Sequence, residues 1–157
     1  QILSRDDMDF SYRHSILKKN RQLYLISARF DLSELREKYS SNVDHIHFRE
    51  HVQPKWNSCG SFFKNPKIDR QVFLSKFPEL SEICPKNISA WFLLEQVWLK
   101  WYTHGWAYFS ELHTNFLMHN GQWTWTDLIF LIKHAQKKVH EKFRIHLENE
   151  VQIIRSQ

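Results

Sequence analysis

A seven-residue segment, Gly60-Ser61-Phe62-Phe63-Lys64-Asn65-Pro66, combines residue types that could carry out acid and anion chemistry. A hydroxyl follows a flexible glycine, two aromatic residues come next, and Lys and Asn donors precede a rigid proline. Such a segment could present a proton donor and anion-binding groups at the edge of an apolar site. Taken alone, the same residues also fit a turn that holds a structural serine.

Other side chains could bind a polar ligand. Arg13, next to Tyr12, offers a planar cation suited to a carboxylate or a phosphate. His113 and Asn115 could donate hydrogen bonds to a ligand. Glu150 lies in a mostly apolar stretch, where it is either a buried acid or a surface residue.

Metal binding is not expected. His45, His47 and His51 lie close together, but no Cys or carboxylate completes a tetrahedral set. Cys59 and Cys84 lack the spacing of a ligand box or a disulfide framework, so we expect two ordinary thiols.

The composition suits a globular domain of ordinary size with a piece of a second domain. The chain has 157 residues, of which 42% are hydrophobic, and its net charge is +5. This charge fits nucleotide ligands, nucleic acids or plain solubility equally well. The longest apolar run near the C-terminal half, 128–132, is far too short to cross a bilayer, and the charged N-terminus is unlike a secretory signal, so we expect a cytoplasmic protein that does not enter a membrane.

Several elements must position these residues. Aromatic and β-branched residues at 10–17 and 23–30 flank a polar turn and predict a hairpin. Residues 31–39 predict a short helix or helical turn, and the polar residues 40–58 predict a linker, with a domain boundary near residue 48.

The second half of the chain predicts two helices and a strand. Apolar residues at 90, 93, 94 and 97 predict a helix within 89–100. Thr124 and Asp127 form a capping-box pattern before a long apolar stripe, which predicts a helix beginning near Thr124. Residues 148–154 alternate in polarity and predict a closing strand, which gives an α+β fold overall.

Glycine is scarce and tryptophan is abundant. The chain has 3 Gly and 7 Trp, whereas a chain of this length holds about 11 glycines on average. Three tryptophans, Trp98, Trp101 and Trp106, fall within one decapeptide. Since glycine serves tight turns and close backbone contacts, other residues must occupy such places here.

These motifs resemble, in order and over nearly the whole chain, those of the UDP-N-acetylenolpyruvylglucosamine reductase family (MurB, also UDP-N-acetylmuramate dehydrogenase). The most specific match is the heptapeptide at 60–66. The others are Tyr12-Arg13-x-Ser15, Leu94-Glu95-Gln96, Leu99-Lys100, Ser110-Glu111-x-His113-x-Asn115-Phe116 and Leu147-Glu148-x-Glu150-Val151.

The resemblance implies a function and roles for particular residues. In that family FAD takes a hydride from NADPH and passes it to the enolpyruvyl group of a UDP-sugar, which yields UDP-N-acetylmuramate for peptidoglycan. By this resemblance Ser61 would protonate the intermediate, while Arg13 and Glu150 would polarise the substrate. The residues expected to line the UDP-sugar site are Tyr12, Lys64, Asn65, His113 and Asn115. We also expect a monomer that binds no nucleic acid.

The chain departs from the family pattern in two ways. The flavin-binding half with its pyrophosphate loop is absent, so residues 1–48 look like the end of the FAD-binding domain and 49–157 like the substrate-binding domain. Such a fragment is expected to hold FAD poorly and to be inactive alone. Gln152 also stands where the family often has Arg, which leaves one anion contact open.

The tryptophans can be interpreted by the same resemblance. The family usually has glycine at the positions of Trp98, Trp101 and Trp106, and Gly or Ala at Trp91; small residues would also fit at Trp56, Trp123 and Trp125. We therefore expect several of these codons to be UGA in a genome that reads UGA as glycine.

Two further functional classes stay open at this point. A basic nucleic-acid-binding module could use exposed Trp and Tyr for stacking, but it would need them beside Lys and Arg on a strand face. A non-catalytic structural domain would keep the scaffold without activity.

Overall fold

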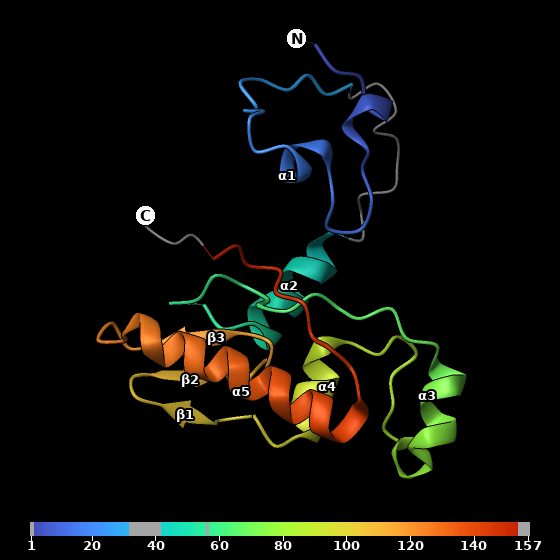
Figure 1. The fold of residues 1–157 in the computed structure, drawn as a ribbon, viewed down its shortest axis with the longest axis vertical. Coiled ribbons are helices and arrows are strands. Elements are labelled where there is room, and N and C mark those ends of the chain that lie inside the picture. Colours follow the sequence, from blue (N-terminus) through green and yellow to red (C-terminus); the bar gives the residue numbers. More distant parts are fainter. Residues whose placement is uncertain (1, 32–41, 56, 154–157) are drawn as a thin grey trace. The chain divides into compact units, whose positions relative to one another are not determined.

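The computed structural model describes residues 2–31, 42–55 and 57–153 (Figure 1). The chain divides into two compact units, Gln1–Ile46 and His47–Gln157. Helices and a small antiparallel sheet make up the fold, which confirms the α+β class. None of the helices among the described residues has the length and apolar character that crossing a bilayer requires.

The unit Gln1–Ile46 contains a 3-10 helix, η1 (Asp6–Met8), a short helix, α1 (Ile16–Lys19), and an isolated antiparallel bridge between Ser11 and His14. The hairpin predicted from 10–17 and 23–30 is therefore wrong. Residues 23–30 form no strand, and Ile26 is 95% exposed. β-branched and aromatic residues favour a strand only where a partner and a buried face exist. The helical turn predicted at 31–39 lies almost wholly outside the described residues.

Helix α2 (Asn42–Val52) replaces most of the predicted linker. The linker prediction is wrong for these residues, since polarity alone does not exclude a helix. The segment contains neither Gly nor Pro, and Pro54 follows its end, where a proline cannot continue a helix.

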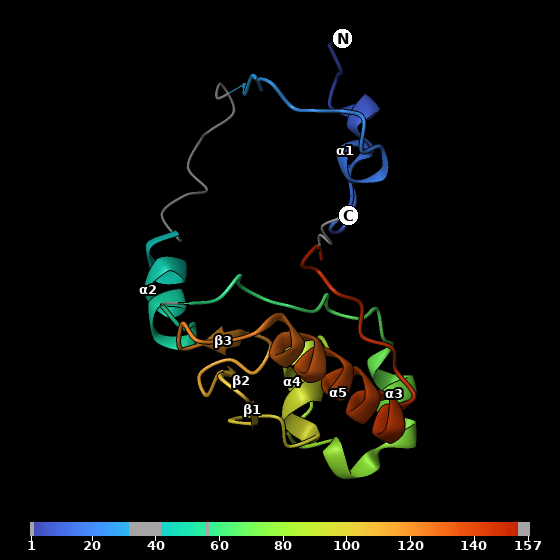
Figure 2. The ribbon, with the colours of Figure 1, turned by 60° about the vertical axis from the view of Figure 1, so that its left-hand side comes forward.

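The unit His47–Gln157 is built on a three-stranded antiparallel sheet of β1 (Thr103–His104), β2 (Ala107–Phe109) and β3 (Leu117–His119), in that order. The long helix α5 (Trp125–Phe143) packs on β1 and β2, and α4 (Ala90–Gln96) packs against α5, as Figures 1 and 2 show. Helix α3 (Arg70–Lys76) and the 3-10 turn η2 (Pro78–Leu80) follow one another beside this core. The most deeply buried side chains include Leu93, Leu94, Phe109, Leu131 and Val139.

The start of α5 confirms the capping box. The Thr124 hydroxyl accepts the backbone N–H of Asp127 at 3.3 Å, and the Asp127 carboxylate accepts the backbone N–H of Thr124 at 2.8 Å. These bonds satisfy two N–H groups that the helix itself leaves unpaired. They also hold the pKa of Asp127 below its usual value. The apolar stripe behind the cap is buried as predicted, at Leu131, Ile132, Ala135, Val139 and Phe143.

Helix α4 is confirmed but ends at Gln96, earlier than predicted. The backbone turns into the left-handed region at Trp98 (φ 61°) and again at Trp101 (φ 67°), which no α-helix can accommodate. The β1–β2 turn has a positive φ at Gly105 (57°) but not at Trp106. This pattern fits a type II′ hairpin turn, which needs glycine only at its first central position.

The closing strand predicted at 148–154 is wrong as an extended strand. The described part of this segment makes one antiparallel bridge, between Asn149 and Phe63. The backbone N–H groups of Glu150 and Val151 both donate to the Phe62 carbonyl, at 2.7 and 3.4 Å. Two residues thus oppose one, as in a bulge, and regular pairing ends there.

Candidate active site

The segment from Ser61 to Lys64 lies between two other segments of the chain and bonds to both. On one side Ser61 forms a bridge with Phe116, and the Phe62 N–H donates to the Asn115 carbonyl at 2.8 Å. On the other side the Lys64 N–H donates to the Glu148 carbonyl at 2.8 Å. The trace that follows α5, drawn in red, passes close to this segment in the ribbon (Figure 1).

Ser61 stands at the edge of the core. It is half-buried, while Phe62 and Phe63, which follow it, are 4% and 1% exposed and contact each other edge to face at 5.2 Å. Gly60 before it has φ 85°, a conformation that favours glycine. The hydroxyl is therefore carried by a backbone that is anchored on its C-terminal side by two buried rings.

Lys64 and Asn65 both contact neighbouring elements. The Lys64 ammonium pairs with the Glu148 carboxylate at 3.0 Å, at a largely exposed position. The Asn65 side-chain carbonyl accepts the Ala90 N–H at 3.0 Å, at the first residue of α4, beside the Ser89 hydroxyl that accepts the Phe92 N–H at 3.2 Å. The heptapeptide thus also fixes where α4 begins.

His113 lies in an aromatic environment. Its ring stacks on Trp91 at 5.3 Å and meets Phe116 edge to face at 4.8 Å. Its Nδ1 is buried without a hydrogen-bond partner. Burial holds the pKa of His113 below its ordinary value of 6.5, although the charge of Glu95 partly opposes this. His113 is therefore a neutral ring at pH 7, able to accept or to donate one hydrogen bond.

Titration of His113 tests whether burial lowers the pKa of its ring. In NMR spectra recorded against pH, the ring resonances of His113 should titrate below pH 6.5. Below pH 6.5 the His113 ring binds a proton more readily in the unfolded chain than in the folded chain. The stability of the fold should therefore fall as pH drops below 6.5. A Glu95→Gln variant should lower the pKa further, since Glu95 favours the charged ring; a higher pKa in that variant would contradict this account.

Asn115 is placed differently from a ligand-binding residue. Its side chain is 2% exposed, and it donates to the Phe63 carbonyl at 2.8 Å while accepting the Phe63 N–H at 2.9 Å. The expected contact with a UDP-sugar does not fit this burial.

The remaining expected residues fall in two places. Glu150 is half-buried in the segment that bonds to Phe62. Tyr12 and Arg13 belong to the unit Gln1–Ile46, where the Arg13 guanidinium lies over the Tyr12 ring at 5.1 Å. Within His47–Gln157 the structure therefore gathers Ser61, Lys64, Asn115 and Glu150 around one extended segment.

Three residues that surround His113 were not predicted as part of the site. Trp91 provides the stacking surface, and the Thr114 hydroxyl, fully buried, donates to the Glu95 carboxylate at 3.3 Å. Glu95 also lies 3.6 Å from the Lys100 ammonium. The sequence offered one signal, the hydroxyl residue Thr114 between His113 and Asn115. Its burial, and so its need for a hydrogen-bond partner, is seen only in the structure.

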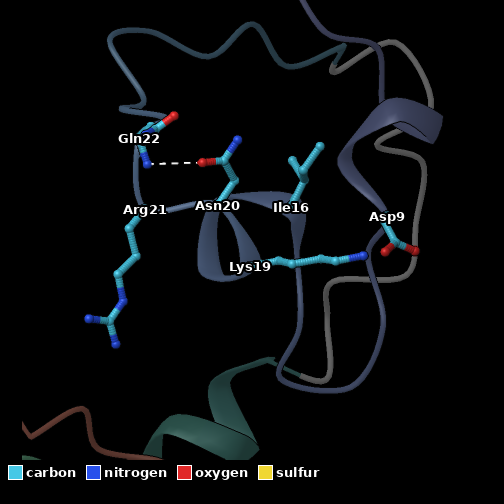
Figure 3. A pocket seen from close by; sticks show the side chains of 6 residues that line it. All are labelled: Asp9, Ile16, Lys19, Asn20, Arg21 and Gln22. Carbon is cyan, nitrogen blue, oxygen red and sulfur yellow. Dashed lines mark hydrogen bonds between the residues drawn. The ribbon is translucent and has the colours of Figure 1, made fainter.

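A hollow in the unit Gln1–Ile46 has none of the residues expected to act in its lining (Figure 3). In it the Lys19 side chain extends toward Asp9, while Arg21 points away. The Gln22 N–H donates to the Asn20 side-chain carbonyl at 3.0 Å. The full lining consists of Asp9, Ile16, Lys19, Asn20, Arg21 and Gln22. Across the described part of the chain, no three His, Cys, Asp or Glu residues gather as a metal site would require.

Comparison with known proteins decides the family. The sequence model of the UDP-N-acetylenolpyruvoylglucosamine reductase C-terminal domain (MurB_C) matches residues 53–154. The chain belongs to this MurB family. The match includes Ser61, Lys64, His113, Asn115 and Glu150, so the gathered residues all lie in the family's C-terminal domain.

Individual MurB relatives agree over nearly the whole chain. The UDP-N-acetylenolpyruvoylglucosamine reductase of Synechococcus sp. (strain WH7803) is 36% identical over 95% of this chain and 43% of its own length. That of Bacillus subtilis (strain 168) is 33% identical over 97% of this chain and 45% of its own length. The crystal structure of the MurB enzyme from Thermus caldophilus is 28% identical, with a TM-score of 0.49 over 70% of this chain and 32% of that one. The chain thus spans a little under half the length of these curated relatives.

Proposed function

We propose that this chain is a fragment of a flavoenzyme that reduces UDP-N-acetylglucosamine enolpyruvate to UDP-N-acetylmuramate, with NADPH as reductant. Residues 1–48 would be the end of its FAD-binding domain, and residues 49–157 its substrate-binding domain. The match to the MurB C-terminal domain over residues 53–154 supports the proposal. Relatives that carry this reductase name also match 95% or more of the chain. We expect the full-length protein to act as a cytoplasmic monomer, without nucleic acid.

FAD, when bound, supplies the hydride in such an enzyme. The three glycines of this chain, at 60, 105 and 121, lie in separate turns. They form no closely spaced glycine turn of the kind that lets a backbone approach a pyrophosphate in dinucleotide-binding folds. We therefore assign no residue of this chain to FAD.

Ser61 is the proposed acid. Hydride addition to one carbon of the substrate double bond moves the π electron pair onto the carbon next to the carboxylate. That carbon then takes a proton from the Ser61 hydroxyl. A half-buried hydroxyl fixed beside two buried rings can hold this orientation, which is what general acid catalysis requires.

Arg13 and Glu150 are proposed to stabilise the charge that develops on the substrate carboxylate. A guanidinium does this directly, because it favours the more negative transition state. Glu150 helps only when protonated or bridged to a cation, since an ionised carboxylate would repel the charge. Tyr12, Lys64, Asn65 and His113 are the proposed contacts to the UDP-sugar; the proposal does not extend to Asn115, which is buried.

The experiment replaces Ser61 by alanine in the full-length protein. The reduction of bound flavin by NADPH should keep its rate, whereas the reduction of the enolpyruvyl substrate should slow by about 10² to 10⁴-fold. Stopped-flow absorbance of the flavin measures both steps.

A Ser75→Ala variant serves as the matched control, because Ser75 is an exposed hydroxyl on α3 that donates to its own helix. It should leave both steps unchanged. Wild-type substrate reduction by Ser61→Ala would refute the assigned acid. Absence of flavin and of any substrate turnover in the full-length protein would instead favour the non-catalytic structural domain.

A further inference from the structure

Asn115 bonds to three backbone groups of the extended segment that carries Ser61. Its backbone carbonyl accepts the Phe62 N–H at 2.8 Å. Its side chain then accepts the Phe63 N–H at 2.9 Å and donates to the Phe63 carbonyl at 2.8 Å. A side-chain amide has the same donor and acceptor pair as a peptide group. Asn115 thus supplies the pairing that the next residue of a neighbouring strand would otherwise supply.

The chain around Asn115 explains why a side chain takes this place. The Ser110 hydroxyl accepts the N–H groups of Leu112 and His113 at 3.1 and 3.4 Å, and the Phe116 N–H donates to the His113 carbonyl at 2.9 Å. These bonds curl residues 110–116 into turns, so their backbone cannot continue beside Phe63. Without Asn115, the N–H and carbonyl of a residue that is 1% exposed would be left unpaired.

The opposite edge of the same strand is also held. The Lys64 N–H donates to the Glu148 carbonyl, and the Glu150 N–H donates to the Phe62 carbonyl. On the N-terminal side, the Gly60 N–H donates to the Ser58 hydroxyl at 3.3 Å, and a Cβ added at Gly60 would meet nothing within 4 Å. The position of Ser61 is therefore set by its own bridge with Phe116 and by the contacts of Phe62 and Phe63.

We propose that Asn115 is a positioning residue that fixes the Ser61 hydroxyl by clamping the Phe63 peptide groups. This inference rests on the proposed role of Ser61 as the acid. It replaces the expectation that Asn115 binds the UDP-sugar. Asn115 then acts on the proton-transfer step only through Ser61.

A double-mutant cycle in the full-length protein tests the clamp. Asn115→Ala should slow substrate reduction by about 10 to 100-fold, because displacement of a catalytic group by about 1 Å has that effect. Flavin reduction by NADPH should be unchanged. In the double variant with Ser61→Ala, the rate should equal that of Ser61→Ala alone within about twofold, since the clamp has no hydroxyl left to position.

The outcomes separate the two claims. If Ser61→Ala is slow and the double variant is slower still by the full Asn115→Ala factor, the clamp is overturned and the role of Ser61 stands. If Ser61→Ala turns over like wild type, both are overturned. Thr114→Val is the matched control: Thr114 is equally buried in the same turn but bonds to Glu95, so its effect should multiply with that of Ser61→Ala.

Asn115→Asp provides a second variant in case Asn115→Ala does not fold. The carboxylate still accepts the Phe63 N–H but cannot donate to the Phe63 carbonyl. Protonation restores a donor, and burial raises the pKa of a carboxyl group. The turnover of Asn115→Asp relative to wild type should therefore rise as pH falls. A ratio that does not change with pH would overturn the clamp.

Discussion

Replacing Trp98 and Trp101 by glycine should stabilise the domain by about 1 kcal/mol at each site. Both residues have left-handed backbones, with φ of 61° and 67°. That conformation costs an L-residue about 1 to 2 kcal/mol and costs glycine nothing. Glycine offsets part of this gain, because the greater freedom of its unfolded chain lowers stability by about 0.5 to 1 kcal/mol. The side chains lose little packing on removal, since they are 88% and 62% exposed. Thermal unfolding followed by circular dichroism should show a rise of about 5 °C per site.

Trp106→Gly is the matched control for these substitutions. Trp106 is similarly exposed, at 53%, and lies in the same loop region, but its φ is not positive. It should not stabilise the domain. A lower melting temperature for Trp98→Gly would show that backbone conformation does not decide stability here.

The codons at positions 98 and 101 test independently whether glycine belongs at these positions. The backbone supports glycine most directly at positions 98 and 101. Trp91, Trp106, Trp123 and Trp125 lie at ordinary φ values, so the physical argument does not extend to them. We expect UGA at 98 and 101, and glycine there in the mass spectrum of the protein isolated from its own cells. UGG codons would exclude the recoding.

Elements with strong local signals were predictable from the sequence. The capping box at Thr124 and the stripe behind it predict the start of α5 and its buried face, because the cap and the apolar spacing agree. The start of α4 was equally clear from its apolar residues. Its end was not, since a tryptophan gives no sign that its backbone is left-handed at 98.

Elements that depend on distant partners were not predictable. Residues 23–30 have the composition of a strand but no pairing within the described residues, and 148–153 pair only around Asn149 and Glu150. The site shows the same division. Ser61 could be picked out as a candidate proton donor from the residues around it, whereas the proposed role of Asn115 depends on a contact 52 residues away along the chain.

Phe63→Ala should have the largest effect on stability, a loss of about 3 to 5 kcal/mol. The ring is 1% exposed and packs edge to face on Phe62, so its removal leaves a cavity that the clamped backbone cannot collapse to fill. Urea denaturation followed by fluorescence measures the loss. Phe30→Ala removes the same atoms from a side chain that is 79% exposed and should change stability by less than about 0.5 kcal/mol.

An equal effect of the two alanine substitutions would contradict the placement of Phe63 in the core. The contrast with Ser61→Ala is equally informative, because the two residues share one strand. Ser61 is only half-buried, so its hydroxyl can be removed without a cavity, and that variant should lose substrate reduction while keeping its stability. Since a domain has only about 5 to 15 kcal/mol of stability in all, Phe63→Ala should remove a large part of it and lower stability and activity together. We therefore expect this segment to separate two tasks by residue, with packing and backbone pairing at Phe63 and the proposed proton transfer at Ser61.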